Sequence, residues 1–352
     1  MATLITGLAG FIGSHLAERL LARGEPVAGL DNFNDFYDPA IKRARVARLA
    51  ELAKANSWPL GEIADADVRD AQAVADLFAR VGPTRVVHIA AMAGVRPSIE
   101  NPKLYAEVNV DGTVNVVEAA AAVGVEKLAF ASSSSVYGNN DKVPFAESDP
   151  VDSPISPYAA TKRAAELCCH AASHLHDLPI ACLRFFTVFG PRQRPDLAIC
   201  KFMRLIAAGE PIPVFGNGST SRDYTYVDDI TQGITLALDA IGRDHRFRIW
   251  NLGGSSPVTL SELIASIERA VGKPAAIDRQ PAQPGDVERT YADLSRSTQE
   301  IGYRPAVPLD EGLKRQWVWL RETDNVTPEP VVTPRSATLR GSTRTDRSAA
   351  PS

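Results

Sequence analysis

Between residues 3 and 185, short apolar runs rich in β-branched residues alternate with longer stretches in which apolar residues recur every three or four positions. The short runs predict strands and the longer stretches predict amphipathic helices, so their alternation indicates βαβ units and an α/β fold with a doubly wound parallel sheet. The expected strands are Thr3–Thr6, Pro26–Leu30, Leu60–Ala64, Arg85–Ala90, Lys127–Ser132 and Ile180–Phe185. The expected helices are Ile12–Arg23, Ala40–Ala55, Ala71–Arg80, Leu104–Val123 and Tyr158–His176, with Gly24 and Gly124 at two of their C-terminal ends.

The pattern loosens after Phe186 into connections that contain Pro and Gly, which is typical of a smaller, loop-rich lobe. A helix at Val227–Ile241 and a strand at Arg246–Asn251 are expected to rejoin the large sheet. From residue 323 onward Pro, Thr, Ser and Arg replace the apolar positions, a composition typical of disorder. We therefore expect a large domain of residues 1–185 and 225–254, a discontinuous α/β lobe of residues 186–224 and 255–322, and a disordered tail at 323–352.

The composition is that of a globular protein, with 45% hydrophobic and 23% charged residues in 352, a length that suffices for about two domains. The 38 basic and 42 acidic residues give a net charge of -4, which argues against a nucleic-acid partner. No apolar run reaches the roughly 18 residues that span a bilayer, and the first strand begins too early for a secretory signal to precede it. The four cysteines lack C-x-x-C spacing. We therefore expect a cytoplasmic protein with reduced thiols and no membrane partner.

A glycine-rich segment, Gly7-Leu8-Ala9-Gly10-Phe11-Ile12-Gly13, joins the first expected strand to the first expected helix. The first glycine permits a tight turn, the second lets the backbone approach a pyrophosphate, and the third lets helix and strand pack closely, with the helix N-terminus facing the anion. Asp31 ends the second strand, where a carboxylate accepts hydrogen bonds from a ribose 2′-hydroxyl and repels a 2′-phosphate. A glycine turn alone is common, but with its strand, its helix and Asp31 it predicts binding of NAD rather than NADP.

The G-x-x-G-x-x-G spacing resembles that of the short-chain dehydrogenase/reductase superfamily. The pair Asp67-Val68 after the third strand resembles the adenine-contacting pair of that superfamily, and the end of the fourth strand at Ala90-Ala91 resembles the backbone that passes under the cofactor. The resemblance implies a Rossmann sheet and a set of further cofactor contacts, namely Phe11, Ile12, Asn32, Asp67, Val68, Ala90, Ala91, Asn109, Tyr158, Lys162 and Phe185.

Tyr158 and Lys162 are four positions apart at the start of an expected helix, which places both on one helical face. An ammonium group there can lower the pKa of the phenol and favour a phenolate base. Alone, such a pair is more often part of a solvated helix face. With the NAD motif and with Ser133 at the end of the fifth strand, it resembles the Ser-Tyr-Lys triad of the same superfamily, which implies catalytic roles for Ser133, Tyr158 and Lys162.

The segments Val136-Tyr137-Gly138 and Arg184 to Gly190 resemble the extended members of the superfamily that act on nucleotide-diphosphate sugars. In those enzymes the tyrosinate takes the proton of the sugar O4 while the C4 hydride passes to NAD, which gives a 4-keto sugar. Sugar 4,6-dehydratases have an Asp-Glu pair directly after the catalytic hydroxyl, and UDP-glucuronate decarboxylases have Glu at the position of Ser135. This chain has Ser134 and Ser135 there. The resemblance therefore implies return of the hydride to the opposite face, which is 4-epimerisation.

The segments Asp31 to Pro39, Ala93 to Ser98 and Phe186 to Pro191 are most similar to those of UDP-glucuronate 4-epimerases, since UDP-glucose 4-epimerases usually carry Asn at the position of Thr187. The resemblance implies conversion of UDP-glucuronate to UDP-galacturonate by a homodimer that pairs two of its helices with those of a second copy. Two alternatives stay open. One is a UDP-glucose or UDP-GlcNAc 4-epimerase, and the other is an NAD-binding regulator without turnover, which typically lacks the Tyr–Lys pair.

A uronate substrate needs its carboxylate held, because a 4-keto uronate is a β-keto acid and can lose carbon dioxide. Ser134, Ser135, Thr187 and Arg194 can supply hydroxyls and a guanidinium for that purpose, although the serines can equally be a strand end of small residues. Arg96 is a further candidate, with a surface charge as the alternative. For the nucleotide, the resemblance implies that Arg222 binds the diphosphate, Phe215 holds uracil and Asp286 lies near the ribose, while Gln283 stands where hexose epimerases often have a second arginine.

Two charged or metal-binding patterns are interpreted as structural. The first is a run of thiols and imidazoles in which His170 and His174 have the spacing of metal ligands, but it continues the helix that begins at Tyr158 and lacks a nearby closing ligand. Its members are Cys168, Cys169, His170, His174 and His176. The second pattern comprises Lys42, Arg43, Arg45 and Arg48, which we interpret as the solvated face of a helix. We expect no metal.

Overall fold

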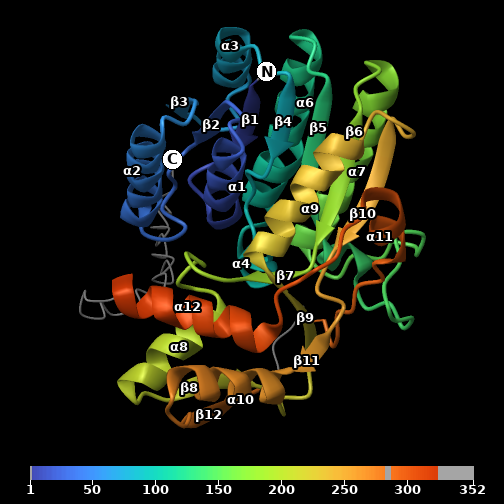
Figure 1. Ribbon diagram of the computed structural model, residues 1–352. Helices are drawn as coiled ribbons and strands as arrows, with labels where there is room; N and C mark the ends of the chain where they lie inside the picture. The colour runs from blue at the N-terminus through green and yellow to red at the C-terminus, as the bar shows by residue number, and fades with distance from the viewer. Residues whose placement is uncertain (1, 282–286, 324–352) are drawn as a thin grey trace, which may run out of the picture.

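A seven-stranded parallel sheet forms the centre of the computed structural model, which describes residues 2–281 and 287–323 (Figure 1). The strand order is β10-β6-β5-β4-β1-β2-β3. The bounds are β1 Thr3–Thr6, β2 Val27–Asp31, β3 Leu60–Asp65, β4 Arg85–His88, β5 Lys127–Ser133, β6 Ile180–Phe185 and β10 Phe247–Leu252. The doubly wound Rossmann sheet expected from the alternating pattern is confirmed, and each expected strand is found within two residues of its predicted ends.

Helices cover both faces of the sheet, which is why its strands read as nearly continuous apolar runs. Consecutive residues of a strand pack into separate apolar cores on the two faces of the sheet. In β1, Ile5 packs with Leu16 and Leu20, whereas Leu4 packs with Val74 and Val116. One face carries α1 Phe11–Ala22, α2 Pro39–Asn56, α9 Val227–Ala240 and α11 Ser295–Ile301. The other face carries α3 Ala71–Val81, α6 Gly112–Ala122 and α7 Pro157–Leu175, with the short α4 Val95–Glu100 and α5 Pro102–Ala106 beside α7.

The helix expected as one piece at Leu104–Val123 is divided in the structure. A π-helical turn, Glu107–Asp111, lies between α5 and α6. A π turn inserts one extra residue into the helix and rotates the side chains there relative to a regular helix. Within that turn Asn109 is buried, accepts a hydrogen bond from the Met92 backbone N–H and donates one to Thr161. The inserted residue therefore ties α6 to the loop after β4 and to α7.

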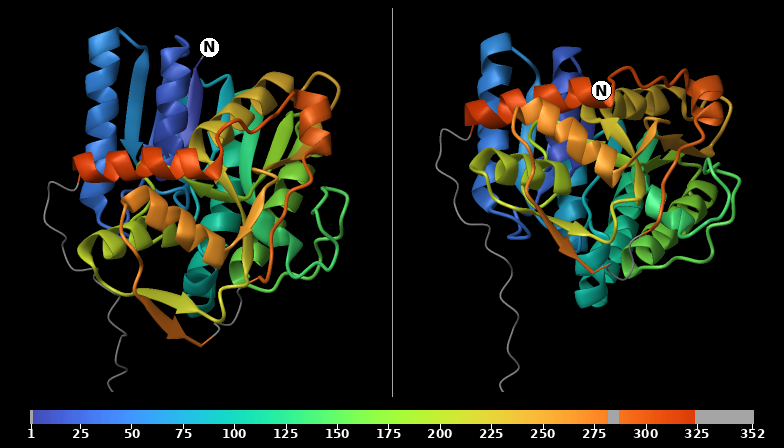
Figure 2. Two further views of the ribbon diagram at one scale, coloured as in Figure 1. Left: turned by 60° about the horizontal axis from the view of Figure 1, so that its bottom comes forward. Right: turned by 90° about the horizontal axis from the view of Figure 1, so that it is seen from below.

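A smaller layer packs against the carboxyl ends of the central strands, as the two views of Figure 2 show. It consists of a three-stranded sheet, a two-stranded sheet and three helices. Their bounds are β7 Thr187–Phe189, β9 Ser221–Tyr226, β11 Pro257–Thr259, β8 Ile212–Phe215, β12 Ile277–Gln280, α8 Ala198–Ala208, α10 Leu260–Val271 and α12 Leu309–Thr323. A separate apolar core that includes Phe189, Met203 and Leu263 holds this layer together. In the described ranges 2–281 and 287–323, no helix combines the length and apolarity needed to cross a membrane.

Candidate functional site

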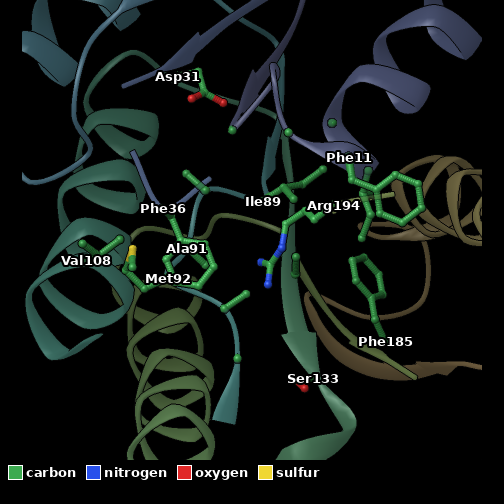
Figure 3. Close-up of a pocket in the computed structure, with 18 of the residues that line it drawn as sticks. Phe11, Asp31, Phe36, Ile89, Ala91, Met92, Val108, Ser133, Phe185 and Arg194 are labelled. Atoms are coloured by element: carbon green, nitrogen blue, oxygen red, sulfur yellow. The ribbon is translucent and has the colours of Figure 1, made fainter. Parts of the chain in front are cut away.

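A cavity of about 370 Å³ lies where the central strands end, between the sheet and the smaller layer (Figure 3). Ligands of open α/β sheets bind at this edge, because the loops after parallel strands converge there. The cavity collects residues that the sequence places more than one hundred positions apart. Of the predicted site residues, those lining it are Gly7, Gly10, Phe11, Ile12, Gly13, Asp31, Asn32, Val68, Ala90, Ala91, Ser133, Tyr158, Lys162, Phe185, Thr187 and Arg194.

The glycine loop has room for no other residue type at two of its positions. Gly7 has a φ of +72°, and a Cβ there would lie 2.8 Å from the backbone nitrogen of Ala90. A Cβ on Gly13 would lie 2.2 Å from the carbonyl oxygen of Gly7. Gly10 caps α1 without any side-chain hydrogen bond, so the positive end of this helix faces the cavity unblocked by a side chain. The loop thus fits the pyrophosphate of a dinucleotide.

Beside the loop, Asp31 is 6% exposed and lies 3.7 Å from the ammonium group of Lys42. Its Oδ1 also accepts a hydrogen bond of 2.9 Å from the Phe33 backbone N–H. Burial raises the pKa of Asp31, while the charge of Lys42 opposes that rise. A carboxylate so placed fits a ribose diol, and with the glycine loop the residues present fit NAD.

Asp67 does not line the cavity but supports a residue that does. Its Oδ2 accepts a hydrogen bond of 2.9 Å from Asn32, and its carboxylate pairs with Arg69 at 2.8 Å. Hydrogen bonds from Arg69 lower the pKa of Asp67 to about 2. Asn109 is likewise outside the lining and acts within the π turn. The structure therefore places both predicted cofactor residues one layer behind the cavity wall.

The interpretation of the α2 basic residues as a solvated face is wrong for two of them. Lys42 and Arg45 are each 5% exposed, whereas the side chains of Arg43 and Arg48 are 62% and 58% exposed. The buried positions of α2 are Lys42, Arg45, Leu49 and Ala53, an uninterrupted stripe at helical spacing. The sequence could have indicated this burial. The helical stripe that contains the apolar Leu49 and Ala53 continues two turns toward the N-terminus to Arg45 and Lys42.

The buried cations of α2 have specific partners around the cavity. Lys42 lines it and donates to Asn34 at 2.9 Å. Arg45 donates to the Tyr37 hydroxyl at 2.8 Å, to the Ala9 carbonyl at 3.1 Å and to the Arg192 carbonyl at 2.7 Å. Arg45 therefore joins the glycine loop to the loop that carries Arg194.

The predicted catalytic residues converge on the cavity from β5 and α7. Ser156 caps α7 by accepting a 3.2 Å hydrogen bond from the Ala159 N–H, and Pro157 occupies the first helical position. This start places Tyr158 and Lys162 on the first two turns, facing the end of β5. Ser133 ends that strand, and its hydroxyl oxygen accepts hydrogen bonds from the backbone N–H of Ser135 at 3.2 Å and from its hydroxyl at 3.0 Å.

The electrostatics of Tyr158 differ from the expected pattern. Burial raises its pKa, while a hydrogen bond with Ser133 and the charge of Arg194 lower it. The Lys162 ammonium, expected to lower the pKa of the phenol, donates instead to the Ala131 carbonyl at 2.7 Å. Burial lowers the pKa of Lys162 to about 8. The groups acting on the phenol here are thus Ser133 and Arg194.

Two of the four residues predicted to hold a carboxylate line the cavity, namely Thr187 on β7 and Arg194 on the loop that follows. The Arg194 guanidinium lies in the pocket (Figure 3), 4.9 Å from the centre of the Phe36 ring, and pairs with Asp196 at 2.8 Å. Ser134 and Ser135 form the turn after β5 and do not line the cavity, and the Ser135 hydroxyl donates to Ser133.

Phe215 and Arg222, predicted to bind the nucleotide, lie outside the cavity lining, as does Arg96, the further candidate for the carboxylate. Arg96 on α4 and Phe215 at the end of β8 contact each other, with the guanidinium carbon 4.4 Å from the ring centre. Arg222 on β9 donates to the carbonyls of Ser221 at 2.9 Å and Glu288 at 3.3 Å. Asp286 and Gln283 lie outside the described residues.

The thiol and imidazole run on α7 has structural surroundings. Cys169 is buried, His170 packs edge-on against Phe247 with ring centres 4.8 Å apart, and His176 pairs with Glu118 at 3.3 Å. Among the residues that the structure describes, no group of three or more His, Cys, Asp or Glu side chains could hold a metal ion.

Comparisons with known proteins agree with this geometry. A family model described as the NAD dependent epimerase/dehydratase family matches residues 3–253. A UDP-glucuronate 4-epimerase of Thermodesulfobacterium geofontis is 41% identical over 320 residues, covering 91% of this chain and 96% of the relative. The crystal structure of the Bacillus cereus UDP-glucuronic acid 4-epimerase with UDP-glucuronic acid and NAD is similar with a TM-score of 0.83 at 32% identity, covering 92% of this chain and 99% of that one. The Thermus thermophilus UDP-glucose 4-epimerase in complex with NAD has a TM-score of 0.81 at 34% identity, covering 92% and 100%. The chain belongs to the NAD dependent epimerase/dehydratase family.

Proposed function

We propose that this protein converts UDP-glucuronate to UDP-galacturonate by inverting C4, with NAD as a bound cofactor. The observation that carries the proposal is that Ser133, Tyr158 and Lys162 line the same cavity as a hydroxyl and a guanidinium suited to a carboxylate. Those two groups belong to Thr187 and Arg194. The substrate's reacting carbon and its C6 carboxylate can therefore be held in one chamber.

In the proposed reaction, NAD supplies reversible hydride acceptance at C4 of the sugar. Tyr158 takes the proton from the C4 hydroxyl, and its hydrogen bond with Ser133 holds the phenol oxygen toward the sugar. The Lys162 ammonium donates to the Ala131 carbonyl at 2.7 Å and places a positive charge in the wall of the cavity. After the 4-keto sugar turns over, C4 would be reduced on its opposite face while Tyr158 returns the proton to the C4 oxygen.

The outcome depends on how the uronate is held. A 4-keto uronate loses carbon dioxide when its carboxylate bond is aligned with the ketone π system. Charge-assisted hydrogen bonds from Arg194 and a hydrogen bond from the Thr187 hydroxyl favour an orientation of the carboxylate in which its bond to C5 is not aligned with the ketone π system. Ser134 and Ser135 cannot act as acid or base at neutral pH, which agrees with epimerisation rather than dehydration.

We also propose the arrangement around this centre. The NAD lobe comprises residues 1–185 and 225–254, and the UDP-sugar lobe comprises residues 186–224 and 255–322. The nucleotide lies across the smaller layer, with the diphosphate near Arg222 and uracil at Phe215, while Asp286, expected near the ribose, lies outside the described residues. Arg96, stacked on the ring of Phe215, lies at the point where the two lobes meet.

A homodimer is part of the same proposal. Val114 on α6, and Leu167 and Leu175 on α7, are 38%, 55% and 73% exposed. Adjacent helices that present large apolar side chains suit a helical interface with a second copy. Light scattering should give the mass of a dimer for the wild type and of a monomer for the Leu167→Glu variant. The four cysteines lack C-x-x-C spacing, which suits reduced thiols in a reducing compartment, and we propose the cytoplasm.

The substrate is tested by comparing kcat/KM for UDP-glucuronate, UDP-glucose and UDP-GlcNAc, with each product resolved from its C4 epimer. We expect UDP-glucuronate to be preferred. Arg194→Gln should lower kcat/KM for UDP-glucuronate by about 10- to 100-fold, the value of a lost charge-assisted hydrogen bond. It should lower UDP-glucose turnover, where present, much less, because only the effect of the Arg194 charge on Tyr158 is then lost. Preference of the wild type for UDP-glucose would favour the alternative that the 34% identical Thermus protein represents.

A further inference from the structure

A fully buried ion pair lies behind the catalytic residues and has no part in the reaction described above. Glu166 on α7 is 0% exposed and Arg184 on β6 is 1% exposed. Two parallel hydrogen bonds of 2.9 Å join the Arg184 guanidinium to both carboxylate oxygens of Glu166. Burial raises the pKa of Glu166, but the bonds and charge of Arg184 outweigh it, so that the pKa is lower than usual and the carboxylate stays ionised.

The pair touches every element that carries a catalytic residue. Glu166 lies one helical turn after Lys162 on α7. Its Oε1 accepts a hydrogen bond of 2.6 Å from Ser132, the neighbour of Ser133 on β5. Arg184 directly precedes Phe185, which lines the cavity at the end of β6. One carboxylate therefore connects α7, β5 and β6 at the level of the active site.

Arg184 also contacts the turn that follows β5. Its guanidinium lies 4.8 Å from the centre of the Tyr137 ring, and Tyr137 ends the turn that contains Ser134 and Ser135. The Tyr137 hydroxyl donates to Asn251 at 2.7 Å, so the turn is fixed to β10 as well. The network is buried, and its contacts join α7, β5, β6 and β10 behind the cavity.

We propose that Glu166 and Arg184 are positioning residues that hold α7 in register against β5 and β6. The inference deepens the proposed function, on which it rests for the roles of Ser133, Tyr158 and Lys162. A buried ion pair contributes little net stability, since desolvation offsets the attraction. Its value here is geometric, because a shift of α7 moves Tyr158 and Lys162 away from Ser133.

The charge of Glu166 also reaches the catalytic groups. Burial lowers the pKa of Lys162, and Glu166 acts against that lowering, together with the nearby thiols of Cys169 and Cys182. On its own helix Glu166 pairs with Arg163 at 3.1 Å, from β6 it faces Arg184, and from β5 it faces the neutral Ser132. From β4, His88 faces Lys162, and burial lowers the pKa of His88 to about 3, so this imidazole is neutral at physiological pH. Glu166 is thus the carboxylate among these groups, and its charge favours the protonated form of Lys162.

The first test is Glu166→Gln in the NAD-loaded enzyme, assayed with whichever UDP-sugar the wild type turns over fastest. We expect kcat to fall at least about 10-fold with KM changed less than about threefold, because the substrate contacts are intact. Loss of the anion lowers the pKa of Lys162, so the limb of the kcat–pH profile that Lys162 controls should move toward acid, by about one pH unit. A merely structural role lowers the active fraction and leaves the profile in place.

Three further variants separate charge from geometry. Glu166→Asp keeps the charge, so its profile should match the wild type while kcat is intermediate. Glu166→Gln with Arg184→Met removes both charges, so the profile should return while kcat stays low. The control is Glu62→Gln, which breaks an exposed Glu62–Arg80 pair of 2.9 Å far from the site and should change neither quantity.

The outcomes distinguish this inference from the proposed function. Absence of turnover of UDP-glucuronate by the wild type contradicts the proposed function only. Wild-type kcat and an unmoved pH profile in Glu166→Gln overturn the positioning role. If that variant does not fold, Glu166→Asp and the double variant decide, and wild-type kcat in both overturns it.

Discussion

At the scale of single residues, the candidate reactive groups could be predicted from the sequence, whereas the buried charged groups behind them could not. Ser133, Tyr158 and Lys162 were predicted from the resemblance to a Ser-Tyr-Lys triad, together with the i, i+4 spacing on α7 and the end of β5. Thr187 and Arg194 were predicted because a uronate needs its carboxylate held, and both line the cavity. Glu166 and Arg184 were missed, since nothing local shows that two charges on different elements are buried against each other.

Tyr158→Phe tests the proposed base directly. The substitution removes the phenol oxygen and leaves the ring that packs edge-on against Tyr105. Loss of a positioned acid–base group should lower kcat by about 10²- to 10⁴-fold. NAD binding, followed by fluorescence titration, should stay within about twofold of the wild type. An active variant would rule out Tyr158 as the base.

At the scale of elements, apolar periodicity predicted the central strands and the helices on both faces. It failed where polar residues are the buried ones, as on α2, and where a helix changes its repeat, as in the π turn at Glu107–Asp111. Neither feature alters the hydrophobic pattern, because both depend on partners in other elements. The buried stripe of α2 places Lys42 against Asp31 and thereby links this helix to NAD binding.

Lys42→Met should weaken NAD binding, because it leaves the buried Asp31 carboxylate without its cation and raises its pKa further. We expect the dissociation constant for NAD at pH 7 to increase about 10-fold, as for loss of a charged hydrogen-bond partner. Arg48→Met, on the exposed side of the same helix, is the matched control and should have no effect. Equal dissociation constants for the two variants would show that Lys42 has no such role.

At the scale of the whole molecule, acid should destabilise the fold through two buried imidazoles. Burial lowers the pKa of His15 and of His88 to about 3, so both stay neutral in the native state well below their ordinary pKa. The unfolded chain protonates them near pH 6.5, so their contribution is fully present above that pH and is lost as pH falls toward 3. Asp223 acts in the opposite direction between pH 4 and 6, since burial raises its pKa to about 6.

His88→Gln isolates one of these contributions. Glutamine can keep hydrogen bonds with Thr6 and Thr113, which His88 contacts at 2.7 and 3.0 Å, but it does not titrate. Between pH 4.5 and 5.5, the dependence of the unfolding free energy on pH should fall by about 1.4 kcal/mol per pH unit relative to the wild type. Urea denaturation at several pH values measures this slope, and an unchanged slope would contradict the assignment.

The central claim, that one cavity removes and returns the same hydride at C4 while keeping the carboxylate, is tested most directly by isotope tracing. UDP-glucuronate deuterated at C4 is incubated with the NAD-loaded enzyme in ordinary water, and the products are resolved by nuclear magnetic resonance. We predict UDP-galacturonate that retains deuterium at C4 and all six sugar carbons. Recovery of a UDP-pentose with release of carbon dioxide, or of epimer that has exchanged its deuterium for solvent hydrogen, would contradict it.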